Sequence, residues 1–103
     1  MRHTLVTYTV KPGREDENVA LVRAVFEELA QTRPAGLRYA VFYLPDSRQF
    51  MHLYNDEGST TGVQGLDSFK AFVAGAEDRH EQPATSTQPE LIGDYRIFND
   101  QGL

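Results

Sequence analysis

The 103-residue sequence contains no cysteine, no tryptophan and no block of lysine or arginine. The absence of cysteine excludes disulfides, thiolate nucleophiles and cysteine-bound metal or iron–sulfur sites. The net charge of −5 argues against a nucleic-acid groove and against binding to an anionic membrane surface. No stretch approaches the ~20 apolar residues of a membrane span, and Met1–Leu5 leads into strand-like residues without an apolar signal region. We therefore expect a cytoplasmic protein with no membrane or nucleic-acid partner.

The residues that are present indicate one domain spanning positions 1–103, because 40% hydrophobic residues suffice for a single core in a chain of this length. The hydrophobic pattern predicts the element order βαββαβ. We expect strands at Thr4–Val10, Leu37–Leu44, Gln49–Tyr54 and Glu90–Phe98, and helices from Arg14 to Thr32 and from Asp67 to His80. The segment Gln82–Pro89 is too polar and too broken by proline to be predicted as an element.

Local signals mark the ends of these elements. Lys11-Pro12-Gly13 stops the first strand, and the acidic run Glu15–Glu17 suits the positive end of a helix dipole. Pro45–Ser47 joins the second and third strands in a hairpin. The polar connection Asn55–Gly65 is expected to form a lid or the rim of a pocket. Gly75 lies inside the second helix, where glycine costs ~1 kcal/mol relative to alanine, and we interpret it as a sign of close packing.

This order predicts an α+β, ferredoxin-like fold with an antiparallel sheet and both helices on one face. The other face needs cover, because the second and third strands are apolar on both sides. In the second strand, one side is Leu37, Tyr39, Val41 and Tyr43, and the other is Ala40, Phe42 and Leu44. We expect a homodimer that pairs these open sheet faces, although the pattern does not decide which side of the second strand faces the partner. The alternative is a monomeric ferredoxin-like domain, which requires a polar outer face.

His52 is the strongest candidate for a functional side chain, because it shares one face of its strand with Phe50 and Tyr54 and such a face can border a pocket. Histidine has an unperturbed pKa near 6.5 and can accept a proton at pH 7, while a tyrosine hydroxyl can bond an enolate oxygen. The candidate catalytic residues are therefore His52 and Tyr54. The candidate ligand-binding residues are Tyr39, Tyr43, Phe50, Phe98 and His80. The alternative is that His52 is a core histidine whose two ring nitrogens are bonded by a tyrosine and a carbonyl, and that the aromatic rings fill the dimer core.

His80 ends the apolar stripe of the second helix and points either into a cleft between helix and sheet or into solvent at the helix end. Glu77, Asp78 and Glu81 lie beside it in the sequence. A metal site needs three or more converging ligands, and acidic residues on a helix usually form a solvated face. We therefore predict no bound metal.

Three segments carry a likeness to a known family: Val10-Lys11-Pro12-Gly13-Arg14-Glu15, Leu37–Val41 and Phe69–Phe72. In them the chain resembles the dimeric α+β barrel proteins, and within these the antibiotic biosynthesis monooxygenase-like branch. The first segment is similar to that family's strand-to-helix turn, the second opens the second strand and the third lies in the second helix. The resemblance spans Thr4 to Phe98 and implies a dimeric α+β barrel.

The resemblance also implies where catalytic residues are to be sought. Haem-degrading members use an Asn on the first strand, a Trp near the end of the third strand and an iron-binding His on the second helix. This chain has no tryptophan, and its first strand carries Thr7 and Thr9 but no Asn, so that His80 alone falls in a corresponding region. Quinone-forming members need neither metal nor flavin and use Asn and Trp near the third strand, where Asn55 is the one counterpart. We expect a protein that works without a cofactor.

Two functions of different class follow from these residues. The first is a cofactor-independent monooxygenase or isomerase that acts on a small aromatic or polyketide-like substrate, with His52 as a base in an apolar cavity. The second is a non-catalytic dimeric module, which either binds a small apolar ligand or fills its interior with its own aromatic rings. A roomy cavity would support the ligand-binding hypotheses, and turnover would separate an enzyme from a binding protein.

Overall fold

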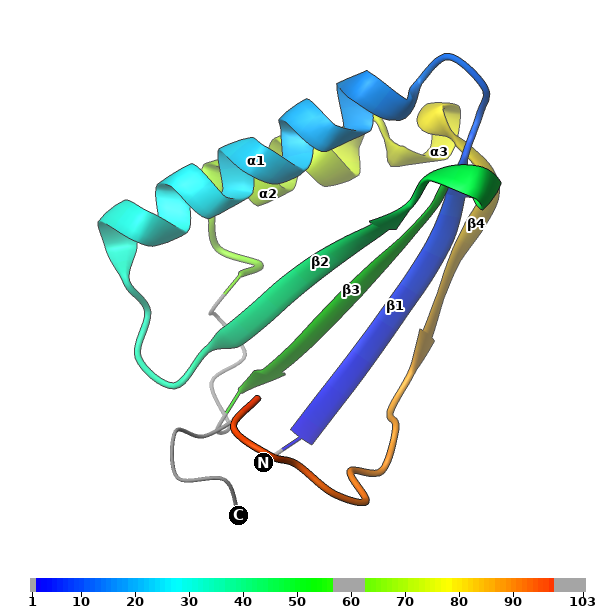
Figure 1. Ribbon diagram of the computed structural model, residues 1–103. Coiled ribbons are helices and arrows are strands. Elements are labelled where there is room, and N and C mark those ends of the chain that lie inside the picture. Colours follow the sequence, from blue (N-terminus) through cyan, green and yellow to red (C-terminus); the bar gives the residue numbers. More distant parts are fainter. Residues whose placement is uncertain (1, 57–62, 98–103) are drawn as a thin grey trace.

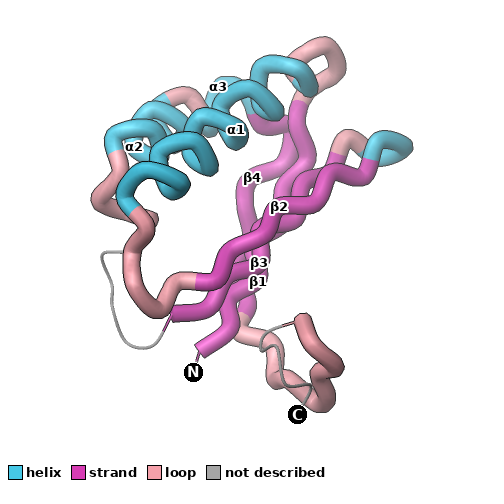
Figure 2. The backbone as a smooth tube through the Cα atoms, turned by 60° about the vertical axis from the view of Figure 1, so that its left-hand side comes forward, coloured by secondary structure: helices cyan, strands magenta, loops and turns pink. Residues whose placement is uncertain are grey.

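The computed structural model describes residues 2–56 and 63–97 of the chain. The strands are β1 (Arg2–Val10), β2 (Arg38–Leu44), β3 (Gln49–Asp56) and β4 (His80–Thr87), and the helices are α1 (Glu15–Thr32), α2 (Asp67–Ala74), α3 (Ala76–Arg79) and the short 3-10 helix η1 (Pro45–Ser47). The strands form one antiparallel sheet in the order β2-β3-β1-β4. Figure 1 and Figure 2 show α1 and α2 side by side on one face of this sheet, with no described helix on the other. The predicted α+β, ferredoxin-like fold is confirmed.

The turn from β1 to α1 explains the Lys11-Pro12-Gly13 signal. The Arg14 backbone N–H donates to the Lys11 carbonyl at 3.1 Å, and Gly13 has a φ of +87°. Proline at the second and glycine at the third position is the pattern of a type II turn, which requires this positive φ. The acidic residues at the start of α1 then lie at the positive end of the helix dipole, as expected.

The core lies between the helices and one face of the sheet. Its buried apolar side chains are Tyr8, Val10, Val22, Val25, Phe50, Leu66 and Phe72. Tyr39 and Val41 of β2 pack against this core, whereas Phe42 is 55% exposed on the opposite face. The structure thereby decides which side of the second strand is outermost: the side that carries Phe42 and Leu44.

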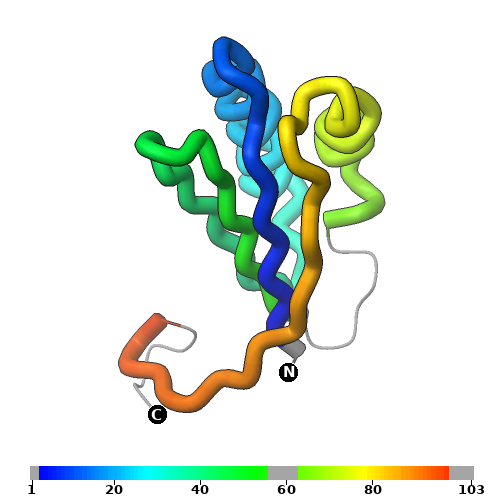
Figure 3. The backbone as a smooth tube through the Cα atoms, turned by 90° about the vertical axis from the view of Figure 1, so that its right-hand side faces the viewer, coloured from blue at the N-terminus to red at the C-terminus, as the bar shows by residue number. Residues whose placement is uncertain are grey.

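The prediction of the last strand is wrong. The final strand is β4, at His80–Thr87, and residues 88–97 contain no helix or strand. β4 is an edge strand that pairs with β1 alone, and every residue after His80 is exposed, so that it needs no apolar alternation. An edge also tolerates Pro83, which cannot donate a ladder hydrogen bond. Figure 3 shows how β4 runs beside β1 before the chain turns away below the sheet.

The second predicted helix divides at Gly75. α2 ends at Ala74 and α3 ends at Arg79, so that His80 begins β4 and does not belong to a helix. A Cβ atom at Gly75 would lie 3.1 Å from Nη1 of Arg79, which confirms the close packing expected there. Phe98 and residues 57–62 of the predicted pocket rim lie outside the described residues.

Candidate functional site

His52 lies in the middle of β3, with its ring between the sheet and the helices. The residue is 5% exposed. Its ring lies 5.3 Å from that of Tyr8, 5.9 Å from that of Tyr39 and 5.5 Å from that of Phe72. Burial of His52 among aromatic rings is confirmed, although these rings come from β1, β2 and α2.

Both ring nitrogens of His52 are hydrogen-bonded to tyrosines. Nε2 lies 2.7 Å from the hydroxyl oxygen of Tyr8, and Nδ1 lies 2.7 Å from the hydroxyl oxygen of Tyr39. A base in direct contact with a ligand needs a free nitrogen, whereas His52 can act on a ligand only through one of these hydroxyls.

The bonds to His52 continue through the layer between helices and sheet as far as α3. The Asn18 amide nitrogen donates to the Tyr8 oxygen at 2.9 Å, and Nε of Arg79 donates to the Asn18 carbonyl oxygen at 2.8 Å. Arg79 is 1% and Asn18 is 0% exposed. We name the five side chains Arg79, Asn18, Tyr8, His52 and Tyr39 the polar chain. It crosses the buried layer from α3 to β2.

Burial sets the protonation states within the polar chain. Burial lowers the pKa of His52 to about 4, with a smaller contribution from the charge of His80, so that the imidazole is neutral at pH 7. Burial also raises the pKa of Tyr8 to about 12, and it raises the pKa of Tyr39. Both phenols therefore keep their protons at neutral pH.

Arg79 is held by contacts with α2 as well as by Asn18. Its Nη2 donates to the carbonyl oxygen of Phe72 at 2.9 Å, and its guanidinium lies 5.0 Å from the centre of the Phe72 ring. Burial lowers the pKa of Arg79, which the nearby Tyr8 and Glu17 partly oppose. Among the described residues, no carboxylate forms an ion pair with this buried cation.

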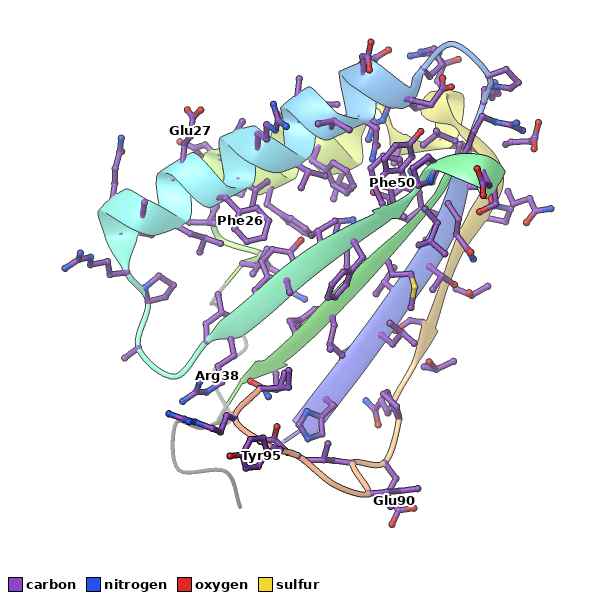
Figure 4. The ribbon with its side chains drawn as sticks, in the orientation of Figure 1. Phe26, Glu27, Arg38, Phe50, Glu90 and Tyr95 are labelled. Atoms are coloured by element: carbon purple, nitrogen blue, oxygen red, sulfur yellow. The ribbon has the colours of Figure 1, made fainter. Side chains whose placement is uncertain are left out.

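An open groove of about 230 Å³ lies between α1 and the β2–β3 side of the sheet. Its lining residues are Val19, Val22, Arg23, Phe26, Val41, Tyr43 and Phe50. Figure 4 shows Phe26 reaching from α1 toward the sheet, while its neighbour Glu27 points away. The ring of Phe26 stacks on that of Tyr39 at 5.0 Å, so that one ring separates the groove from the end of the polar chain.

The structure brings some of the predicted site residues to this groove and leaves others away from it. Phe50 and Tyr43 line it and stack on each other at 4.6 Å. Tyr39 borders it through Phe26. His52 and Tyr54 are not lining residues, and the ring of Tyr54 meets that of Tyr39 edge-on at 6.0 Å.

His80 begins β4 and does not end a helix, and its ring lies inward rather than in solvent. Its ring stacks on Tyr8 at 4.1 Å, and its Nε2 is buried without a hydrogen-bond partner in the described part of the chain. Burial lowers the pKa of His80, and the charge of Arg79 acts in the same direction. Within residues 2–56 and 63–97, no three His, Asp or Glu side chains come together as ligands for a metal ion.

Three members of the polar chain were missed by the sequence reasoning. Tyr8 lies in the inward-facing row of β1, two positions before Val10. Asn18 lies four positions before Val22, and Arg79 lies seven positions after Phe72. Each is therefore a polar group at an apolar position of a strand or helix pattern. A polar residue at an apolar position was the signal in the sequence that could have identified these three residues.

Comparison with solved structures identifies the fold. The crystal structure of an antibiotic biosynthesis monooxygenase gives a TM-score of 0.70 at 17% identity, over 89% of this chain and 99% of that chain. The chain shares the fold of that protein. A protein from Nitrosomonas europaea, proposed to be an antibiotic biosynthesis monooxygenase, gives a TM-score of 0.74 at 14% identity, over 89% of this chain and 99% of that one. A protein from Pseudomonas aeruginosa gives 0.67 at 23% identity, over 89% and 95% of the two chains.

The shared fold confirms, for the arrangement of elements, the resemblance seen in the sequence. No family model and no curated protein matches the sequence. None of the described helices is both long and apolar enough to cross a membrane. At these identities the match shows the fold, and an activity must be inferred from the groove and the polar chain.

Proposed function

We propose that the protein binds a small aromatic or polyketide-like molecule in the groove and acts on it without a cofactor, as a monooxygenase or isomerase. The observation that carries this proposal is that the groove reaches Phe26, whose ring stacks on Tyr39 at the end of the polar chain. The groove is apolar apart from Arg23 and the Tyr43 hydroxyl, which suits a flat ligand with a polar substituent. At about 230 Å³ it suits a ligand smaller than the drug-sized ones that occupy ~300–1,000 Å³.

Such a reaction begins when a phenol, or a carbon beside a carbonyl, loses a proton. The resulting anion either takes up a proton elsewhere, which is isomerisation, or reacts with O2. In the second case a CH2 group becomes C=O, O2 accepts all of the electrons released, and its other oxygen atom leaves as water. The substrate is the only reductant, so this chemistry requires the protein to hold the substrate and to stabilise its anion.

In this proposal His52 acts through Tyr39, because both of its ring nitrogens bond tyrosines. His52, which the sequence predicted as a base, here positions the Tyr39 hydroxyl, and Tyr54, whose ring meets Tyr39 edge-on, is the proposed second hydroxyl near the ligand. Phe50 and Tyr43 supply the wall on which the ligand packs.

The test is a screen of phenols and 1,3-dicarbonyl compounds under O2, followed by oxygen uptake and product mass. We expect turnover by the wild type and a loss of about 100-fold or more in Tyr39→Phe and in His52→Ala, the range typical of losing a positioned donor to a developing anion. Tyr95→Phe is the matched control, because Tyr95 is 77% exposed and lies outside the groove. Turnover that is unchanged in Tyr39→Phe would contradict the proposed site.

A non-catalytic binding protein is the second candidate. It is favoured by the two occupied nitrogens of His52 and by the low pKa of its ring, about 4, which are typical of a core histidine. Tight binding of a phenol without turnover, in the same screen, would select this candidate.

We further propose a homodimer through the open sheet face. Phe42 is 55% and Leu44 is 36% exposed there, and Ile92 and Ile97 in the segment after β4 are 97% and 72% exposed. Exposed apolar side chains of this size favour an interface. Light scattering should therefore give the mass of a dimer, and Phe42→Glu should give a monomer. Val73→Glu on α2, where the valine is 51% exposed away from this face, is the matched control and should stay dimeric.

A monomeric wild type at micromolar concentration would contradict the proposed dimer. The cytoplasmic location stays a prediction, which fractionation of cells that express the protein would test.

A further inference from the structure

The polar chain has a direction, because the side chain at its α3 end can only donate hydrogen bonds. Arginine has no acceptor, so Arg79 must donate through Nε, and Asn18 must present its carbonyl oxygen. If the Asn18 amide were flipped, its NH2 group would face the Nε–H of Arg79, and neither group could accept a hydrogen bond. The amide nitrogen of Asn18 therefore faces Tyr8 and donates to its oxygen.

This direction passes through Tyr8 to His52. The Tyr8 oxygen accepts from Asn18, and its own O–H is left for His52 Nε2 at 2.7 Å. Nε2 is then the acceptor, and the single ring proton of neutral His52 lies on Nδ1. Nδ1–H donates to the Tyr39 oxygen at 2.7 Å, so that Tyr39 accepts from the polar chain and keeps its own O–H.

The opposite direction would leave a donor unpaired in the core. With the proton on Nε2 of His52, Tyr8 would receive two donors and would have no acceptor for its O–H among the described residues. Leaving a buried polar group without a partner destabilises the fold. Tyr8 is 3% exposed, whereas Tyr39 is half-buried beside the groove. The hydroxyl proton that is not used within the polar chain is therefore the one on Tyr39.

We propose that the polar chain presents the Tyr39 hydroxyl as a hydrogen-bond donor to a ligand oxygen, with Arg79, Asn18, Tyr8 and His52 as positioning residues. The ligand group is a phenolate, enolate or carbonyl oxygen, because a donor fixed in a buried site stabilises an oxygen that carries negative charge. This inference rests on the proposed function for the place of the ligand. It assigns the pair of His52 and Tyr39 to stabilising an anion and leaves removal of the proton to another acceptor, such as water.

The tautomer of His52 tests the direction without any ligand. In the folded wild type, NMR of the 15N-labelled histidine ring should show the proton on Nδ1. Asn18→Asp should move it to Nε2, because a carboxylate accepts from both Arg79 and Tyr8, so that Tyr8 then accepts from Nε2–H and Tyr39 donates to Nδ1. Arg79→Lys should retain the wild-type tautomer, since lysine also only donates.

Tyr43→Phe is the matched control for these spectra, because it removes a hydroxyl from the same face of β2 without touching the polar chain. A proton on Nε2 in the wild type, or a tautomer that does not change in Asn18→Asp, would overturn the inference.

Binding of 4-nitrophenolate, followed by its absorbance, tests the donor itself. Tyr39→Phe and Asn18→Asp should each weaken binding by roughly 10- to 100-fold, the effect of one hydrogen bond to a charged group. Tyr95→Phe should bind as the wild type does. Equal affinity in the wild type and Tyr39→Phe overturns the inference. A wild type with the expected tautomer that binds no phenol refutes the proposed function instead.

Discussion

The burial of His52 predicts a loss of stability when the pH falls below 6.5. Its pKa is 6.5 when exposed and about 4 in the fold, so that between these values the unfolded chain binds the proton and the folded chain does not. The stabilisation is complete above pH 6.5 and is lost as the pH falls toward 4. Between pH 7.5 and pH 4.5 the loss amounts to about 2–3 kcal/mol. That is a large share of the ~5–15 kcal/mol that holds a typical domain folded.

Urea unfolding at pH 7.5 and pH 4.5, followed by circular dichroism, measures this loss. His52→Gln is the reference, because its amide can bond both tyrosines and does not titrate. All carboxylates, and His80 with its lowered pKa, are common to the two proteins and cancel in the difference. The wild type should lose about 2–3 kcal/mol more than His52→Gln. Equal losses would show that His52 is not held neutral in the core, and would refute the reasoning.

Three further substitutions test the packing around the site. Gly75→Ala should cost about 1–2 kcal/mol in urea unfolding, because the new methyl group meets Arg79, which is fixed by its own hydrogen bonds. Gly93→Ala is the control and should be neutral, because there is open space around Gly93. Equal losses of stability in the two variants would contradict the close packing at Gly75. Tyr8→Phe should cost about 2–4 kcal/mol, because it leaves two buried polar groups without a partner, and a loss below 1 kcal/mol would contradict the polar chain. Val41→Trp should fill the groove and abolish binding of 4-nitrophenolate without unfolding the protein, whereas unchanged binding would place the ligand elsewhere.

The first three strands and the long helix could be predicted because each has a periodicity of its own. β3 alternates around His52, and α1 repeats apolar residues that end in the core. β4 could not be predicted in the same way, because it forms by pairing with β1 and buries almost nothing. The last strand was instead predicted near residues 90–97, because this segment contains apolar residues, although its large apolar side chains are exposed.

The candidate site was predicted in part for a related reason. Alternation along β3 predicts that His52 faces inward, but its hydrogen-bond partners come from strands and a helix that are distant in sequence. Tyr8 is 44 residues away from His52, and Arg79 is 61 residues away from Asn18. Such pairs depend on the register between strands and on where a helix crosses them, which local patterns do not contain. A polar residue at an apolar position indicates that a partner exists without saying which one.

The polar chain is not the simplest way to fill the layer between helices and sheet. Burying the Arg79 cation costs desolvation that no carboxylate in the described residues repays, and apolar replacements of buried charged groups are often neutral or stabilising. Stability requires only that each buried donor meets an acceptor. Asn18→Asp would meet that requirement in the same volume, with Arg79 paired and the tautomer of His52 reversed. The two directions therefore differ chiefly at Tyr39, whose hydroxyl faces outward as a donor in one and turns inward in the other. Only a molecule that meets this hydroxyl distinguishes them, which is why we connect the direction of the polar chain to a ligand rather than to the fold.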